Sequence, residues 1–153
     1  MIDIQPIQLL SALLTPVIAV VTTYIAIQQY RTSRLKFKLE LFEKRYAIYQ
    51  GVKNFILSAV HAANLSNDDF FKFNEETQDA FFLFDERVDR YIDELRSKGA
   101  KLRYVNERLS DQSLPIGEER SKLAEEDAEL NIWFGNQLLE SKQVFKKYLR
   151  VSQ

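Results

Sequence analysis

The feature that most constrains this chain is a long segment without charge near its start. No charged side chain occurs from Ile4 to Tyr30, a run of 27 residues. Its centre, Leu9 to Ile27, is mostly apolar, and most of its polar side chains are small hydroxyls. A helix rises about 1.5 Å per residue, so this centre would extend roughly 28 Å, close to the thickness of a bilayer's hydrocarbon core. The sequence therefore predicts a transmembrane helix within residues 1–30.

Three other interpretations of this segment are weaker. A cleaved signal peptide has basic residues before its apolar core, whereas the only charge there is Asp3. A core helix of a soluble bundle seldom stays free of charge for so long. An amphipathic helix on a membrane surface needs a charged face, which is missing here. Pro16 does not exclude a membrane helix, since such helices tolerate an internal proline.

Charge is distributed unevenly, although the formal net charge is only −1. Residues 31–53 carry seven basic and two acidic side chains, and residues 54–153 carry 14 basic and 19 acidic ones. Basic residues directly after a span resist translocation, so residues 31–153 are expected in the cytoplasm and the N-terminus outside. The sequence thus predicts a single-pass protein of the cell inner membrane.

The basic residues nearest the predicted span form a candidate membrane interface. Two roles are open for them: binding anionic lipid headgroups, or simply preventing translocation. The four residues are Arg31, Arg34, Lys36 and Lys38.

The rest of the chain shows helical periodicity and no sustained alternation of period two. From Leu35 to Ala63, apolar residues fall at heptad spacing, interrupted only by Lys53. Such spacing is typical of a helix that packs against another helix. We call this pattern the heptad seam, and its candidate helix–helix interface residues are Leu35, Leu39, Phe42, Tyr46, Tyr49 and Ile56.

Two further helices are predicted after this one. Ser66 and Asp69 have the spacing of a capping box, which would begin a second helix, with a restart at Asn74 and a kink near Gly99 left open. Residues 110–117 have the composition of a turn, and a third helix would follow. The expected fold class is all-α, with one N-terminal transmembrane helix and an antiparallel bundle of about three long helices in residues 31–153. The second helix should bury Phe81, Phe84, Val88, Tyr91, Leu95, Leu102, Val105 and Leu109, and the third should keep Lys146, Lys147 and Arg150 in its last turn.

The composition offers little for catalysis. There is no cysteine and only one histidine, His61, which excludes thiolate chemistry and multi-histidine metal sites. Adjacent acidic residues point in different directions on a helix, and no phosphate-binding glycine loop is present. We therefore predict no enzyme activity, no catalytic, cofactor-binding or metal-binding residues, no nucleic acid and no small-molecule substrate.

Three segments carry a resemblance to known proteins. They are RTSRLKFKLELFEKRYAIY after the apolar segment, FFLFDERVDRYIDEL, and LPIGEERSKLAEEDAELNIWF with a later VFKKYL. Together they resemble a family of small bacterial membrane-anchored helical proteins, over nearly the whole chain. The resemblance implies the anchored helical architecture, and it implies no activity, substrate or site residues.

Two functional hypotheses follow. The first is a non-enzymatic module that binds membrane lipid through residues 1–30 and forms a homo-oligomer or holds an unidentified protein partner. The second is a pore-forming or membrane-perturbing effector of the toxin or defence type. The second is allowed because Ser11, Thr15 and Thr22 would lie near one face of the span.

Overall fold

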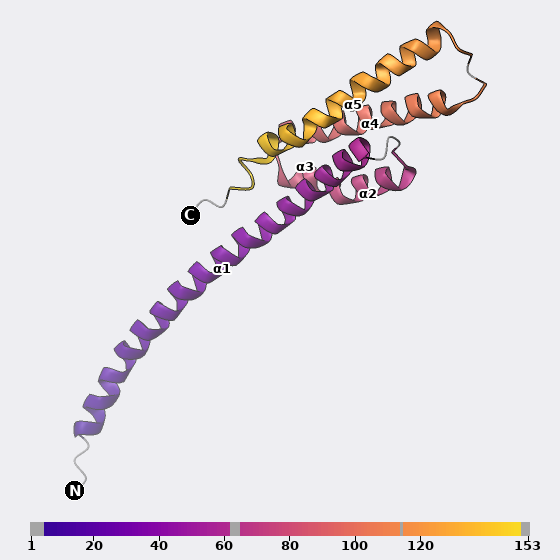
Figure 1. The fold of residues 1–153 in the computed structure, drawn as a ribbon. Helices are drawn as coiled ribbons and strands as arrows, with labels where there is room; N and C mark the ends of the chain where they lie inside the picture. Colours follow the sequence, from indigo (N-terminus) through magenta and orange to yellow (C-terminus); the bar gives the residue numbers. More distant parts are fainter. Residues whose placement is uncertain (1–4, 62–64, 114, 151–153) are drawn as a thin grey trace. The chain divides into compact units, whose positions relative to one another are not determined.

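The computed structural model describes the backbone of residues 5–61, 65–113 and 115–150, and the side chains of these residues except for 5–13 and 15. All regular secondary structure in these ranges is helical, which confirms the all-α prediction. The chain divides into two compact units, residues 1–40 and residues 41–153, which we call the N-terminal unit and the bundle unit. Figure 1 shows the helices α1 (Gln5–His61), α2 (Asn67–Thr77), α3 (Ala80–Leu83), α4 (Glu86–Ser110) and α5 (Glu118–Phe145).

The N-terminal unit contains the first part of α1. Every described side chain from Leu14 to Glu40 is exposed. Among the described residues, no helix combines the length and the apolar character needed to cross a membrane. The predicted span, residues 9–27, begins among side chains that lie outside the described residues. The predicted boundary after residue 30 lies inside α1.

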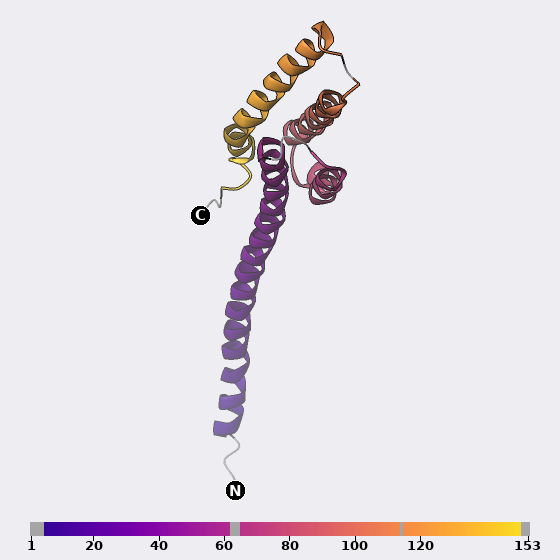
Figure 2. The same cartoon turned by 45° about the vertical axis from the view of Figure 1, so that its right-hand side comes forward.

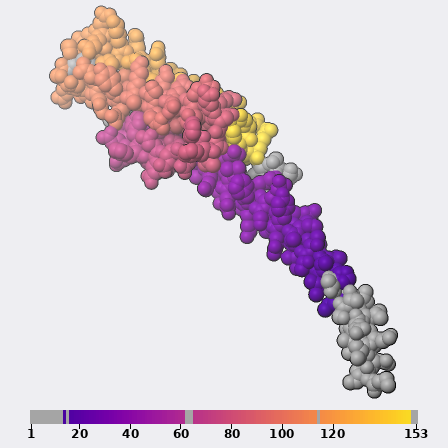
Figure 3. Space-filling view, turned by 180° about the vertical axis from the view of Figure 1, so that it is seen from behind, coloured from indigo at the N-terminus to yellow at the C-terminus, as the bar shows by residue number. Residues whose placement is uncertain are grey.

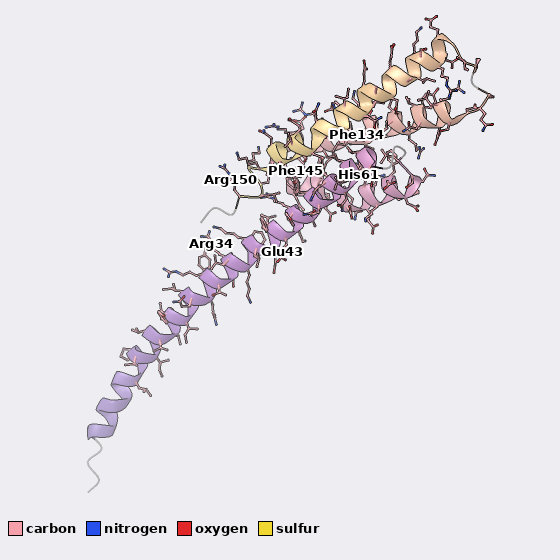
Figure 4. All side chains as sticks on the ribbon, viewed as in Figure 1. Arg34, Glu43, His61, Phe134, Phe145 and Arg150 are labelled. Carbon is pink, nitrogen blue, oxygen red and sulfur yellow. The ribbon has the colours of Figure 1, made fainter. Side chains whose placement is uncertain are left out.

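The core of the bundle unit is built around Phe55 of α1. Its ring stacks on Phe73 of α2 with a centroid distance of 4.2 Å, and it contacts Phe134 of α5 at 6.4 Å. Nearer to the start of the unit, the Tyr49 ring lies 5.5 Å from that of Phe145. Residues later in α1 therefore contact residues earlier in α5, so the two helices are antiparallel. Figure 4 labels Phe134 and Phe145 on α5.

Two glycines allow helices to approach closely in this core. A Cβ atom on Gly99 of α4 would lie 2.7 Å from Cζ of Phe55, and one on Gly51 of α1 would lie 2.6 Å from Cβ of Glu76. Both distances are too short for real atoms, so a side chain at either position would force its neighbour to move. Gly99 does not break its helix, because α4 is continuous from Glu86 to Ser110.

Helices α4 and α5 form an antiparallel hairpin, joined by the predicted turn (Figure 1). Next to the turn, Nη2 of Arg108 lies 2.9 Å from Oε1 of Glu119, and Lys101 pairs with Glu126 further along. The predicted burial of α4 is confirmed for five of its residues: Val88, Tyr91, Leu95, Leu102 and Val105. The predicted end of α5 is wrong, because the helix ends at Phe145 and Lys146, Lys147 and Arg150 follow it.

The segment before α4 is more divided than the sequence suggests. The capping box is confirmed: Oγ of Ser66 accepts a hydrogen bond from the backbone N–H of Asp69, whose carboxylate accepts one from the backbone N–H of Ser66. No helix restarts at Asn74, which lies within α2. The chain instead breaks after Thr77 and again at Phe84, which is extended and leads into Asp85, the N-cap of α4. Figure 2 shows the short helices beside α4, and Nε of Arg96 on α4 donates a hydrogen bond to Oδ1 of Asn74 on α2 at 2.8 Å.

Candidate interaction surfaces

The predicted membrane-interface residues all lie on exposed parts of the N-terminal unit. Arg31, Arg34, Lys36 and Lys38 are exposed, and Figure 4 labels Arg34 on α1. The guanidinium of Arg34 lies 5.1 Å from the centroid of the Tyr30 ring, which is a cation–π distance. The four cations are therefore available to anionic groups around this part of α1.

The N-terminal unit also exposes large apolar side chains. Between Leu14 and Tyr30 no described residue is charged, and those with large apolar side chains are all exposed. The remaining positions are mainly alanine, threonine and glutamine. Contiguous exposed apolar surfaces of this kind are typical of sites that contact lipid or another protein. Its exposed apolar residues are Leu14, Val17, Ile18, Val20, Val21, Tyr24, Ile25, Ile27 and Tyr30.

The hydroxyl groups of Thr22 and Thr23 are hydrogen-bonded within their own helix. Oγ1 of Thr22 donates to the carbonyl oxygen of Ile18 at 2.9 Å, and Oγ1 of Thr23 donates to that of Ala19 at 2.8 Å. Threonine hydroxyls bonded in this way need no water or partner helix.

The heptad seam is divided between the two units. Leu35 and Leu39 are exposed in the N-terminal unit. In the bundle unit the Tyr49 ring packs on Phe145, and Ile56 is 0% exposed. For these two residues the neighbouring helices belong to the same chain.

Between these ends of the seam, the rings of Phe42 and Tyr46 stack at a centroid distance of 5.8 Å. Phe42 is half-buried, whereas Tyr46 is exposed. The face of α1 that fills the core instead combines Ile56 of the seam with apolar residues beside the seam, which are Ile48, Val52, Phe55 and Ala59.

Helix α5 carries an exposed apolar stripe that the sequence reasoning missed. Ile132 is 67% exposed and Leu139 is 69% exposed, although both lie in a helix that contributes to the core. Ala128 and Gly135 are exposed at the intervening helical positions. In the sequence these four residues are spaced by four, three and four positions, which is the spacing of one helix face. We call Ala128, Ile132, Gly135 and Leu139 the α5 stripe.

Three exposed phenylalanines lie on α2 and α3. Phe81 and Phe82 are 70% and 80% exposed, and their rings contact each other edge to face at 5.4 Å. Phe71 of α2 is also exposed and lies beside acidic residues such as Glu75. The predicted burial of Phe81 is therefore wrong.

A polar cluster ties the start of α4 to the segment that follows α5. Oδ1 of Asp85 accepts the backbone N–H of Arg87, and its Oδ2 lies 2.6 Å from Nζ of Lys147. Chiefly because of the hydrogen bond from Lys147, the pKa of Asp85 is lowered to about 2. Nearby, Nε of Arg45 donates to the carbonyl oxygen of Leu83 at 3.0 Å. These contacts fix the end of α3, the start of α4 and the segment after α5, and they place no nucleophile next to a base.

The described residues contain no group of acidic or histidine side chains that could hold a metal ion, and His61 is exposed. The hydroxyl of Tyr91 is buried, and it has no hydrogen-bond partner among the described residues. Burial raises its pKa, and the nearby Glu140 and Glu94 raise it further. On the described face shown in Figure 3, the bundle unit has no deep hollow.

Comparison with known proteins brings no relative: no protein-family model, curated protein or solved structure matches the chain. The resemblance to small bacterial membrane-anchored proteins therefore stays a prediction.

Proposed function

We propose that this chain is a non-enzymatic, membrane-anchored helical module that self-associates or holds a protein partner. The observation that carries the proposal is the exposed, charge-free first part of α1. Large apolar side chains such as Val17 and Val20 are exposed there, with no charged residue between Leu14 and Tyr30. Burying such side chains is worth about 1.5–3 kcal/mol each, so water is an unfavourable environment for them.

Lipid is the covering that suits this segment best. Leu14, Val17, Val21 and Ile25 recur at steps of three and four, and Val20 and Ile27 extend the apolar surface to one side. Alanine and threonine occupy the remaining face, and small residues of this kind favour helix–helix contact in membranes. A bilayer can cover the broad apolar face while leaving the narrow face for a second helix.

The basic residues after the segment fit the same proposal. Arg31, Arg34, Lys36 and Lys38 are exposed and follow the apolar residues directly. Each basic residue near an anionic membrane surface contributes about 1 kcal/mol of attraction. Under the positive-inside rule these residues and the bundle unit would lie on the cytoplasmic side of the inner membrane.

The alternative function is a pore-forming or membrane-perturbing effector, and the described threonine hydroxyls do not support it. Thr22 and Thr23 already donate to carbonyl oxygens of their own helix. They are therefore compatible with plain lipid and do not call for a water-filled lumen. Ser11 and Thr15, on which the predicted polar face depends, lie outside the described side chains.

Flotation of the full chain with liposomes of mixed neutral and anionic phospholipid tests the proposal. We expect the wild-type chain to float with the lipid, and Val17→Asp combined with Val21→Asp to remain largely in the dense fraction. Phe81→Asp combined with Phe82→Asp is the matched control, because it also replaces two exposed apolar residues and should float as the wild type does.

Two outcomes would contradict the proposal: a wild-type chain that stays in the dense fraction, or a Val17 and Val21 variant that floats as well as the control. Release of a dye trapped in the same liposomes by the wild-type chain would support the pore-forming alternative instead.

A further inference from the structure

We infer that two copies of this chain pair through the outer face of α5, with the two helices antiparallel. The inference rests on the proposed self-association, and it names the surface and the geometry of that association. The partner it requires is a second copy of the same chain.

The α5 stripe lies on the side of its helix that the bundle does not use. The buried residues of α5 include Leu130, Phe134, Gln137, Ser141 and Val144. With 3.6 residues per turn, Ala128, Ile132, Gly135 and Leu139 lie on the opposite side of the helix from this buried face. The stripe is exposed throughout, and a Cβ atom on Gly135 would meet nothing within 4 Å.

The stripe is complementary to itself in shape when it is reversed. In an antiparallel pair, a register that sets Ile132 opposite Gly135 of the second copy also sets Leu139 opposite Ala128. Each large side chain thus faces a small one, which allows close packing of the two helices. The same contacts recur on the other side of a two-fold axis, as an interface between identical copies requires.

The charges at the ends of the stripe fit the same register. Glu125 precedes Ala128 by three residues and Lys142 follows Leu139 by three, so each Glu125 faces Lys142 of the second copy. Both side chains are exposed, and neither takes part in an ion pair within the described residues. A parallel pair would instead set Glu125 beside Glu125 and Lys142 beside Lys142, which is unfavourable. Charge complementarity therefore selects a second copy in the antiparallel direction.

The interface is small, since each copy contributes only two large apolar side chains. Anchoring in a membrane compensates for this, because it confines the copies to two dimensions and raises their effective concentration. We therefore expect reversible pairing that depends on the ratio of protein to lipid.

Charge reversal tests the register directly. Glu125→Lys alone and Lys142→Glu alone each place like charges together twice in the pair, and each should raise the Kd of the dimer about tenfold. The double variant, Glu125→Lys with Lys142→Glu, should recover the wild-type Kd. Sedimentation equilibrium of the full chain in a neutral detergent measures all four proteins. Single variants that associate normally, or a double variant that does not recover, would overturn the inference.

Gly135→Leu provides a second test that does not disturb the single chain. Because nothing lies near Gly135 within the chain, the leucine should leave the melting temperature unchanged or higher. It should abolish pairing, since it would occupy the space of Ile132 from the second copy. A Gly135→Leu chain that still pairs like the wild type would contradict the proposed contact.

Disulfide crosslinking fixes the direction, because the chain has no native cysteine. Ala128→Cys mixed with Leu139→Cys should crosslink readily in liposomes. Leu139→Cys alone should not, since two such positions would lie about 16 Å apart along an antiparallel pair. Efficient crosslinking of Leu139→Cys to itself would indicate a parallel pair and overturn the inference.

These outcomes are separable from failure of the proposed function. A chain that floats with liposomes but shows none of the α5 effects would support the membrane anchor and refute the α5 interface. If association were lost only in Leu35→Asp combined with Leu39→Asp, the heptad seam would be the contact surface and the α5 inference would be wrong. A chain that does not float would refute the anchor whatever α5 does.

Discussion

Replacing Gly99 by alanine should destabilise the bundle unit, although alanine is the better helix former. In an exposed helix interior, alanine is favoured over glycine by about 1 kcal/mol. At Gly99 the new Cβ would lie 2.7 Å from Cζ of Phe55 and 3.2 Å from Cδ1 of Leu65. The Phe55 ring cannot retreat freely, because it is stacked on Phe73 at 4.2 Å.

The size of the effect follows from these opposing contributions. Overpacking a well-filled core costs about 1–3 kcal/mol, which outweighs the gain in helix propensity. We expect Gly99→Ala to lower the free energy of unfolding by up to about 2 kcal/mol. For a chain of this length, each kcal/mol corresponds to a shift of about 2–4 °C in melting temperature.

Gly135→Ala is the matched control, because it makes the same substitution in the interior of a helix where a Cβ meets nothing within 4 Å. It should raise the free energy of unfolding by about 0.5–1 kcal/mol. Urea unfolding of the detergent-solubilised chain, followed by circular dichroism at low protein concentration, measures both variants. If Gly99→Ala stabilised the chain as much as Gly135→Ala does, the close approach at Gly99 would be refuted.

Substitutions at three further positions test local contacts. Ser66→Ala removes the capping box of α2 and should lower the free energy of unfolding by about 0.5–2 kcal/mol in the same urea assay, whereas Ser66→Asp should retain most of it. The stabilisation from the lowered pKa of Asp85 is present above about pH 4 and lost as the pH falls towards 2, so thermal melts of Asp85→Asn should lose less stability over that range than the wild type. The raised pKa of Tyr91 means that the wild type loses stability above about pH 10, where the unfolded chain releases the phenol proton. Tyr91→Phe should flatten that alkaline loss and gain about 1 kcal/mol at neutral pH, and an unchanged alkaline profile would contradict the burial of the hydroxyl.

Much of the fold could be predicted because local signals agreed with each other. The helical periodicity of α4, the capping box at Ser66 and the turn before Glu118 are each encoded within a few neighbouring residues. The break before α4 was harder to predict, because the apolar spacing continues through Phe81 and Phe84. The sequence nevertheless contains a local signal for the start of α4, because the N-cap Asp85 is followed by the acidic residues Glu86 and Asp89 in the first turn.

The interaction surfaces were less predictable for a different reason. Heptad spacing shows that a helix packs against something, but it does not show whether the neighbour belongs to the same chain. Ile56 of the heptad seam is buried by its own bundle, whereas Ile132 and Leu139 are exposed. Only the three-dimensional arrangement assigns the two faces of α5, because both faces carry apolar residues at helical spacing.

The central claim, that the first part of α1 is covered by lipid, is tested most directly by cysteine accessibility. Val20 is exposed and lies in the middle of the charge-free segment, and the chain has no native thiol. Thiols react with maleimide as thiolates, which require water. Val20→Cys in native membranes should therefore resist maleimide until detergent is added, whereas Asn136→Cys in the bundle unit should react in the same opened membranes without detergent. Full labelling of Val20→Cys before detergent is added would contradict the account.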